Sequence, residues 1–229
     1  MSLPQPVPPS WKDLGKNSAD LLGKDYPVAG AHIDIKTKTP NGITFKIVGD
    51  RDSKNLITGD IETKYTDFKN GLTLTQTWTT ANALKTAVEL ENYGTNGLKL
   101  DVATSLQADK MTKGAVFSAT YKQPGIHSRI SLDAVKGPTC TVETAFGLRG
   151  FVLGSEAAYN VGEGKVLRYG LGTCFNAPSY AATILALNNC KTFTASYYHR
   201  VSSDVEAGAR ATYDNKNPSA VNLEVGTKA

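Results

Sequence analysis

The stretch that decides the fold runs from Gly97 to Gln107 and reads Gly-Leu-Lys-Leu-Asp-Val-Ala-Thr-Ser-Leu-Gln. Apolar and polar residues alternate along it, and in an extended strand alternate side chains point to opposite faces. The stretch therefore predicts a β-strand with one apolar and one polar face. The apolar face carries Leu98, Leu100, Val102 and Leu106, and the polar face carries Lys99, Asp101, Ser105 and Gln107.

The same alternation recurs from residue 28 almost to the end of the chain. It forms about 15 segments, each close to the roughly 10 residues that a tilted membrane strand needs. The connections are short and rich in turn-forming residues, as at Asn41-Gly42 and Asn70-Gly71, so consecutive strands are expected to pair antiparallel as a meander. No composition shift or long linker divides the chain of 229 residues, which favours a single β-domain over residues 28–229.

Residues 1–27 differ from the rest, because their apolar residues recur at a helical period. Ser10 and Asp13 have the spacing of a capping box, and Pro27 ends the pattern. We expect an amphipathic helix that either caps the domain with its apolar face or lies at a membrane surface or inside a pore. Its apolar face contains Trp11, Leu14, Ser18, Leu21 and Leu22, and its polar face contains Lys12, Asp13, Lys16, Asp20 and Lys24.

The composition excludes several classes of protein. No run approaches the roughly 18 apolar residues of a transmembrane helix, and Met1 to Pro9 lacks the apolar core of a secretory signal. Cys140, Cys174 and Cys190 are an odd number without metal or redox spacing, and we expect them to be small residues of the wall. The net charge of +4 comes from basic residues interspersed with acidic ones, which argues against nucleic-acid binding. Such a balance suits a surface or lumen with a mild preference for anions.

Motifs for catalysis, cofactor binding or metal binding are not found in the sequence. His32, His127 and His199 are far apart, and none belongs to a ligand pair. The run from Gly162 to Lys165 lacks the spacing of a phosphate loop and predicts a turn. We therefore expect no enzyme activity, no cofactor and no metal. Glycines in or beside strands predict bends or close backbone contacts at Gly147, Gly150, Gly154, Gly170 and Gly172.

Alternation alone leaves the environment of the apolar face open. A soluble sandwich or ligand-carrying barrel hides its apolar side chains, whereas a membrane barrel exposes them to lipid. A closed soluble barrel of so many strands would be too wide for side chains to fill. The polar face also mixes charged residues with Gly, Ala, Ser and Thr, as a wall facing water does. Both observations favour a membrane barrel, and a soluble carrier stays the alternative.

One polar residue interrupts the apolar face of a strand. In the stretch from Leu72 to Trp78, the alternation places Gln76 between Leu74 and Trp78 on the side expected to meet lipid. One explanation for Gln76 is a strand end near the membrane interface, where an amide and a tryptophan are tolerated. The alternative is a functional polar position in the membrane wall, used for contact with a partner or a lipid.

Several dispersed motifs resemble those of the mitochondrial porins, the voltage-dependent anion channels. They are Asp13-Leu14-Gly15-Lys16, Asp34-Ile35-Lys36-Thr37-Lys38 with Asn41-Gly42, Glu62-Thr63-Lys64-Tyr65, Gly71-Leu72-Thr73 with Trp78, and Gly97-Leu98-Lys99-Leu100. The resemblance covers essentially the whole chain in order and is most specific in its first half. It implies an all-β fold, an antiparallel meander β-barrel of the mitochondrial outer membrane, with a short N-terminal amphipathic helix in the lumen.

The resemblance also implies a function, that of a voltage-gated, weakly anion-selective diffusion channel for small hydrophilic metabolites such as ATP, ADP, phosphate and small ions. Lys16 and Lys24 match positions at which the family places lysines proposed to contact nucleotide, and Lys12 lies with them on the polar face of the helix. The implied partners are membrane lipid, small anionic metabolites and nucleotides, kinases of the hexokinase type and further copies of the chain. Lumen-facing charges are expected from Lys64, Lys99, Arg129, Arg168 and Arg210.

The sequence departs from the family pattern in three places. Gln76 stands where many animal members have a membrane-facing glutamate, and Asp25 to Gly30 replaces a glycine-rich hinge. The sequence also supplies about 15 strands where the family has 19. Unpaired strand edges within hydrocarbon leave backbone groups unsatisfied at several kcal/mol each. We therefore expect the barrel over residues 28–229 to be incomplete at its C-terminus and to form the family's pore poorly. The alternative function is a non-conducting porin homologue that acts as an interaction partner.

Overall fold

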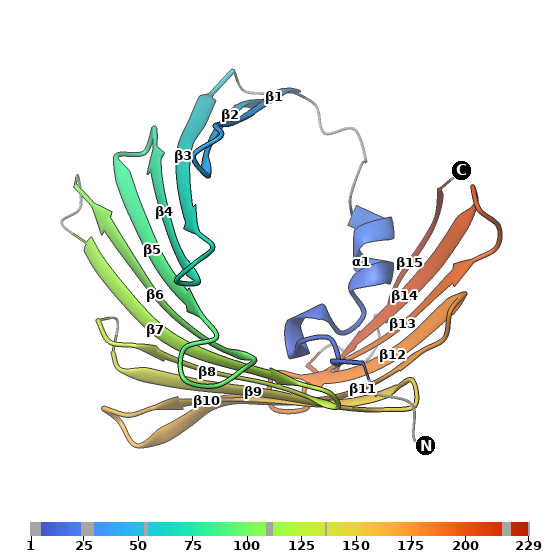
Figure 1. The fold of residues 1–229 in the computed structure, drawn as a ribbon. Helices are drawn as coiled ribbons and strands as arrows, with labels where there is room; N and C mark the ends of the chain where they lie inside the picture. Colours follow the sequence, from blue (N-terminus) through green and yellow to red (C-terminus); the bar gives the residue numbers. More distant parts are fainter. Residues whose placement is uncertain are drawn as a thin grey trace. The chain divides into compact units, whose positions relative to one another are not determined.

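A computed structural model describes residues 6–23, 30–52, 55–108, 112–135, 137–216 and 221–228. Their strands form one sheet of 15 strands whose order follows the chain from β1 to β15 (Figure 1). Neighbouring strands pair antiparallel from β1 to β6 and from β10 to β15. The predicted antiparallel meander is therefore confirmed. The strands are β1 Gly30–Lys38, β2 Ile43–Asp52, β3 Ile57–Asp67, β4 Leu72–Thr79, β5 Ala83–Glu91, β6 Leu98–Gln107, β7 Thr112–Gln123, β8 Ile126–Asp133, β9 Thr139–Leu148, β10 Phe151–Asn160, β11 Lys165–Asn176, β12 Tyr180–Leu187, β13 Thr192–Arg200, β14 Glu206–Asp214 and β15 Val221–Lys228.

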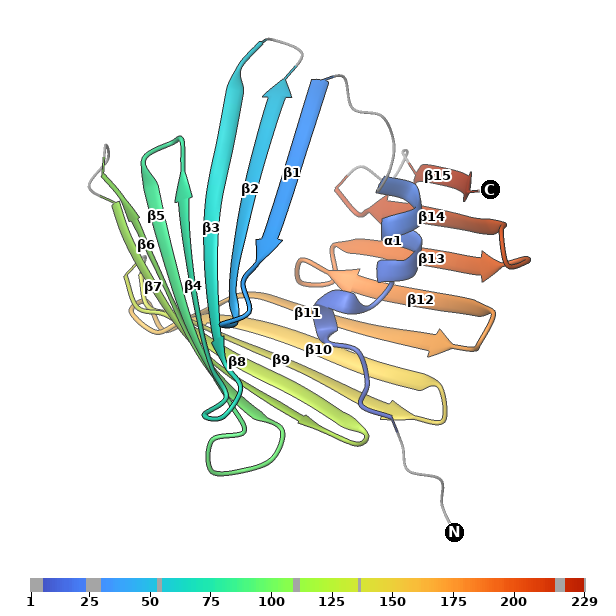
Figure 2. The ribbon, with the colours of Figure 1, turned by 45° about the horizontal axis from the view of Figure 1, so that its top comes forward.

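The chain divides into two compact units, which we describe one at a time. The segment unit comprises Met1–Tyr26, Tyr121–Ile130 and Cys140–Ala229, and it contains the N-terminal segment with β9 to β15. The strand unit comprises Pro27–Thr120 and Ser131–Thr139, and it contains β1 to β6 with most of β7. Figure 2 shows the long hairpins of the strand unit, where the predicted turns at Asn41-Gly42 and Asn70-Gly71 are confirmed.

The N-terminal segment is two short helices rather than the one continuous helix that the periodicity predicts. A 3-10 turn, η1, spans Trp11–Asp13, and the α-helix α1 spans Lys16–Gly23. The break lies at Gly15, whose φ of +76° is a left-handed conformation that a helix cannot contain. The expected capping box is also wrong, since the Ser10 side chain caps no backbone N–H and donates instead to the Asp13 carboxylate. Neither described helix has the length and apolar character needed to cross a bilayer.

The two faces of the sheet differ as the alternation predicts, and the apolar face is the exposed one. Ile57 in the strand unit is 72% exposed, and Leu153 and Val225 in the segment unit are 62% and 71% exposed. Buried hydrophobic residues gather mainly where the N-terminal segment covers the polar face of the segment unit. An apolar face of this extent is unstable in water and needs a hydrocarbon environment. This exposure contradicts the soluble alternative, which requires the apolar side chains to be hidden.

Candidate functional site

The N-terminal segment packs on the polar face of the segment unit with the side chains that the sequence predicts. Trp11, Leu14, Ser18 and Leu21 are buried and Leu22 is half-buried, which confirms the expected apolar face across the break at Gly15. Trp11 and Leu14 form a small core with wall residues Ala145 of β9, Val152 of β10 and Cys174 of β11. In Figure 1, α1 lies along β13 to β15, the strands with which its residues make contact.

Glycines of the wall leave the space that the segment occupies. A Cβ atom added at Gly154 would lie 2.7 Å from both Leu14 Cδ1 and Trp11 Cε3. One added at Gly208 would lie 2.8 Å from Leu21 Cδ2, and one at Gly147 would lie 2.9 Å from Pro8 Cβ. Contacts below 3.0 Å are not sustained by real side chains, so alanine at Gly147 or Gly154 would displace the segment at the rigid rings of Pro8 and Trp11. At Gly208 the flexible end of Leu21 can move aside. The close contacts expected at the strand glycines are therefore confirmed. The N-terminal segment is the nearest element at Gly147, Gly154 and Gly170, whereas the nearest atoms at Gly150 and Gly172 belong to the wall itself.

Two carboxylates of the wall hold the start of the segment. Lys12 Nζ lies 2.8 Å from Glu143 Oε1, and the Glu143 side chain is only 5% exposed. Trp11 Nε1 donates to Glu156 Oε2 at 2.9 Å. Arg168 of β11 pairs with the same carboxylate, with its Nε 2.7 Å from Glu156 Oε1. A buried carboxylate without a partner costs free energy. The docked position of the segment therefore depends on the charges of Glu143 and Glu156.

A local network of Ser10, Asp13 and Lys16 fixes the turn that joins the two helices. Ser10 Oγ donates to Asp13 Oδ2 at 2.6 Å, and Lys16 Nζ donates to Asp13 Oδ1 at 3.1 Å. The Ser10 hydrogen bond, opposed by partial burial and aided by Lys16, holds the pKa of the Asp13 carboxyl below its ordinary value. The same carboxylate raises the pKa of Lys16. Lys16 is thus held in an ion pair rather than left as a free cation.

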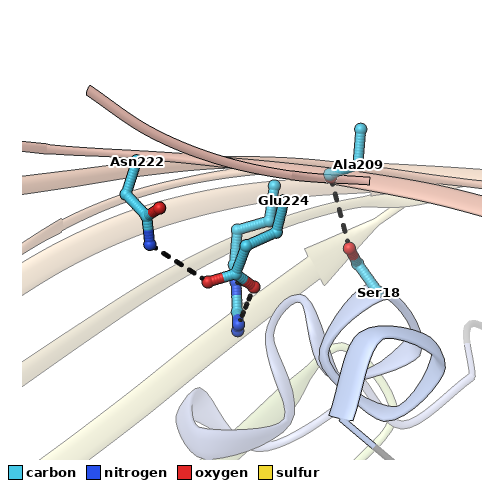
Figure 3. A network of polar contacts seen from close by, with 5 residues as sticks. Ser18, Ala209, Asn222 and Glu224 are labelled. Carbon is cyan, nitrogen blue, oxygen red and sulfur yellow. Dashed lines mark hydrogen bonds and ion pairs between the residues drawn. The ribbon is translucent and has the colours of Figure 1, made fainter. Parts of the chain in front are cut away.

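The far end of the segment contacts β14, next to a second network. Ser18 Oγ donates to the Ala209 carbonyl at 3.3 Å, and Asn222 Nδ2 donates to Glu224 Oε1 at 3.2 Å (Figure 3). Arg210 Nε also donates to Glu224, at 3.0 Å from Oε2. Arg210 therefore lies on the polar face, as expected, but its charge is neutralised by the carboxylate on β15.

The remaining basic residues predicted for the site are distributed over both units. Lys99 lies on the polar face of the strand unit and pairs with Glu89 at 2.9 Å and with Glu91 at 3.8 Å. Lys64 is exposed on the polar face of β3 and forms no ion pair among the described residues. Arg129 is half-buried in β8. Lys24 lies outside the described residues, so its position stays a prediction.

Sequence reasoning missed the acidic partners and one lysine. Glu143 and Glu156 each follow the alternation of their own strands, but nothing in the local pattern pairs them with Lys12 and Arg168. The lysine is Lys85 of β5, which lies directly opposite Thr77 and Ser105 and therefore on the polar face. Only the register of neighbouring strands reveals which cations have a carboxylate within reach.

Gln76 lies in the middle of an apolar face and not at a strand end. It is the fifth residue of β4, which spans the 8 residues Leu72–Thr79, and its side chain is exposed. The residues directly opposite it are Thr63 on β3 and Thr86 on β5, and Thr86 faces Thr104 on β6. Gln76 is therefore not at a strand end, and it belongs to a polar row that crosses four strands of the otherwise apolar face.

A row of aromatic rings follows one edge of the apolar face in the segment unit. Phe151 and Phe175 lie 4.6 Å apart between ring centroids, and Phe175 lies 5.9 Å from Tyr180. Tyr180 continues to Tyr197 at 6.3 Å, and Tyr197 stacks on His199. Amphipathic rings of this kind gather at the level of the membrane–water interface. The row therefore indicates where the hydrocarbon region ends on β10 to β13.

The polar face offers charged and hydroxyl side chains. Within the described ranges, no three His, Cys, Asp or Glu side chains gather in an arrangement that could hold a metal ion. The arrangement is that of a wall which is wet on one side and apolar on the other, with a charged segment on the wet side. Such a wall can line a path for small hydrophilic solutes.

Comparison with known proteins identifies the family. The family model described as eukaryotic porin matches residues 7–229. The chain belongs to the eukaryotic porin family. It is 41% identical over 221 residues to the mitochondrial outer membrane protein porin of Neurospora crassa, covering 96% of this chain and 78% of the relative. It is 34% identical over 225 residues to the non-selective voltage-gated ion channel 1 of Saccharomyces cerevisiae, covering 96% of this chain and 78% of the relative.

Solved structures support the same fold for this porin. A triple variant of the Rhodopseudomonas blastica porin superimposes with a TM-score of 0.59 at 12% identity, over 86% of each chain. A second variant of that porin gives a TM-score of 0.61 at 12% identity. The chain is therefore a β-barrel channel protein of the mitochondrial outer membrane, and its family and fold are those of channels rather than enzymes. The polar face is accordingly the lumen side, and the apolar face meets lipid.

Proposed function

We propose that this porin is a voltage-gated, weakly anion-selective diffusion channel for small hydrophilic metabolites such as ATP, ADP, phosphate and small ions. One observation carries the proposal: a charged N-terminal segment is a separate element docked on the lumen wall, where Lys12 pairs with Glu143 and Trp11 donates to Glu156. A charged element that can leave the wall responds to a transmembrane field, at about 2.3 kcal/mol per charge and 100 mV. The name of the yeast relative, a voltage-gated ion channel, supports this reading.

The charge balance supports a weak anion preference. The chain carries 25 basic and 21 acidic residues. Several lumen cations are paired with carboxylates, which cancels their fields at short range. The surplus that remains is small, and salt screens it further, so the selectivity between anions and cations is expected to be modest. Kinases of the hexokinase type and further copies of the chain stay predictions as partners.

Planar-bilayer recording of the refolded chain tests both parts of this proposal. Because we expect the 15 strands to form the pore poorly, stepwise conductance should follow only a minority of insertions. The channels that do open should close under a moderate voltage and give a reversal potential in a KCl gradient of the sign that anion preference gives. Glu143→Gln removes the charged partner of Lys12, at a cost to docking of about 1 kcal/mol, and should shift the closing voltage. Glu163→Gln, in the exposed turn between β10 and β11, removes the same charge away from the segment and is the matched control.

Two results would contradict the proposal. An integral membrane protein that gives no conductance would favour the alternative of a non-conducting interaction partner. Equal shifts of the closing voltage in Glu143→Gln and Glu163→Gln would show that net charge, rather than docking of the segment, sets the response.

A further inference from the structure

The polar face of β1, β2 and β3 carries acidic residues at one end and lysines at the other, and we call this face the polarised strip. In chain order, β1 has an acid before its lysines, β2 has its lysine before an acid, and β3 again has acids before a lysine. Neighbouring strands are antiparallel, so these reversals give the same polarity in space on all three strands, which lie side by side in Figure 2. The residues are Asp34, Lys36 and Lys38 on β1, Lys46 and Asp50 on β2, and Asp60, Glu62 and Lys64 on β3.

The strand register gathers these charges into rows that cross the strip. Lys38 of β1 and Lys64 of β3 lie in one row, next to the turn between β1 and β2, and carry two positive charges. Asp34 and Asp60 lie in another row and carry two negative charges. The two rows are four residues apart along each strand, which is about 14 Å at about 3.4 Å per residue. This separation exceeds the Debye length of about 10 Å at about 0.1 M salt, so an ion in the lumen meets two separate fields.

Ion pairs within the strip remove only part of this separation. Lys46 Nζ lies 3.2 Å from Asp34 Oδ2, and His32 Nδ1 lies 2.5 Å from Asp50 Oδ1. The row next to the lysine end keeps a surplus of one positive charge, since it holds Lys36, Lys46 and Glu62. Among the residues that the structure describes, three charges of the outer rows are exposed and form no ion pair, namely Lys38, Lys64 and Asp60.

The strands that follow β3 do not share this pattern. The polar face of β4 presents hydroxyl groups, from Thr73, Thr75, Thr77 and Thr79. On β5 and β6, bases and acids are mixed, and Lys99 pairs with both Glu89 and Glu91. The separation of charge is therefore a property of β1 to β3, and it lies wholly within the strand unit.

We propose that the polarised strip makes ion flow through the lumen depend on the direction of the applied field. Clusters of one sign of charge on a channel wall raise the local concentration of ions of the opposite sign. A field that drives anions inward from the lysine end and cations inward from the acid end fills the strip with both kinds of ion. The opposite field empties the strip, so the current is smaller. This inference rests on the proposed function, because only a conducting lumen can show the difference in current.

Single-channel recording in planar bilayers tests the effect on ion flow. The quantity measured is the ratio of the larger to the smaller current at equal and opposite voltages below the closing voltage, which does not depend on the direction of insertion. The ratio should exceed one in about 0.1 M KCl and approach one in about 1 M KCl, where the Debye length falls to about 3 Å.

Two double variants that leave the net charge unchanged make the test specific. Lys38→Gln with Asp60→Asn removes one charge from each end of the strip, and should bring the ratio in about 0.1 M KCl close to one. Lys99→Gln with Glu89→Gln is the matched control, because it removes two opposite charges only 2.9 Å apart, and should leave the ratio as it was. A ratio of one in the unchanged chain, or equal ratios in the two double variants, would overturn the proposal.

A second measurement needs no conductance. Thr44→Cys places a thiol directly opposite Lys38 and Lys64, and Thr58→Cys places one directly opposite Asp50 at the acid end. In the chain folded in detergent micelles, each thiol is treated with an anionic and with a cationic methanethiosulfonate reagent, and the rates are read by mass spectrometry. The ratio of the anionic to the cationic rate should be about tenfold higher at residue 44 than at residue 58, the lower end of the enrichment that charged clefts produce.

The two measurements separate this proposal from the proposed function. Equal rate ratios at the two positions would overturn the polarised strip, whether or not the chain conducts. A chain that conducts equally in both directions refutes only the effect of the strip and leaves the channel intact. A tenfold difference of the rate ratios in a chain that does not conduct supports the separation of charge and refutes only the channel.

Discussion

Replacing Gly154 with alanine should lift the N-terminal segment from the wall while leaving the sheet intact. The added Cβ would lie 2.7 Å from Trp11 Cε3 and 2.7 Å from Leu14 Cδ1. Both atoms belong to the segment, so the strain falls on docking and not on strand pairing. Gly172 is a less selective position, because its added Cβ would also lie 2.4 Å from Leu185 Cδ2 within the wall.

The magnitude follows from the overlap. An ordinary contact between carbon atoms is about 3.5–4.0 Å, so the segment must move by about 1 Å at two well-packed side chains. Overpacking of this kind costs about 1–3 kcal/mol. At 1.4 kcal/mol for each factor of ten, the ratio of docked to undocked segment should fall by roughly 5- to 150-fold.

Fluorescence of Trp11 reports the displacement. Trp78, which is 62% exposed on the apolar face, is first replaced by phenylalanine so that a single tryptophan remains. In the Gly154→Ala variant, acrylamide should quench Trp11 more strongly, and its emission should move to longer wavelength. Gly49→Ala is the matched control, because an added Cβ at Gly49 in β2 has nothing within 4 Å. Unchanged quenching in Gly154→Ala would refute the view that this glycine provides the space for Trp11.

Three further substitutions have defined outcomes. Ser10→Ala should raise the pKa of Asp13 toward its ordinary value, as measured by carboxyl NMR titration. Because the pKa of Asp13 is depressed in the folded chain, the Asp13 carboxylate stabilises the fold at pH values above its ordinary pKa. This stabilisation is lost as the pH falls through the depressed pKa, and Ser10→Ala should make it smaller. Trp11→Phe keeps most of the buried ring but removes the donor to Glu156, and it should lower the free energy of unfolding by about 1 kcal/mol in denaturant titration followed by circular dichroism. Gln76→Leu should raise the free energy of unfolding in lipid vesicles by about 1 kcal/mol, since it removes an exposed amide from the apolar face. A loss of stability would instead show that the amide has a partner in the membrane.

The strands could be predicted from the sequence because their signal is local. Each strand, such as β6 with Leu98 and Leu100 on one face, carries its own alternation and needs no information about its neighbours. The buried face of the N-terminal segment was likewise predictable from Trp11, Leu14 and Leu21. The break at Gly15 was not predictable, because many helices tolerate a glycine within the helical period. The glycine becomes a break only when the wall fixes the positions of η1 and α1 on either side of it.

The function of the charges could not be predicted, because it depends on which strands are neighbours. From the sequence, eight basic residues were expected to contact nucleotide or to face the lumen. Five of these eight form ion pairs with carboxylates in the structure: Lys12, Lys16, Lys99, Arg168 and Arg210. A paired cation contributes little to the field that a passing solute meets, since the two charges cancel beyond a few ångströms. The preference for anions should therefore depend on those lysines of the polar face that form no ion pair among the described residues, such as Lys64 and Lys85, far more than on the net charge of +4. By this reasoning, neutralising Lys99 should alter selectivity less than neutralising Lys85, although both substitutions change the net charge by the same amount.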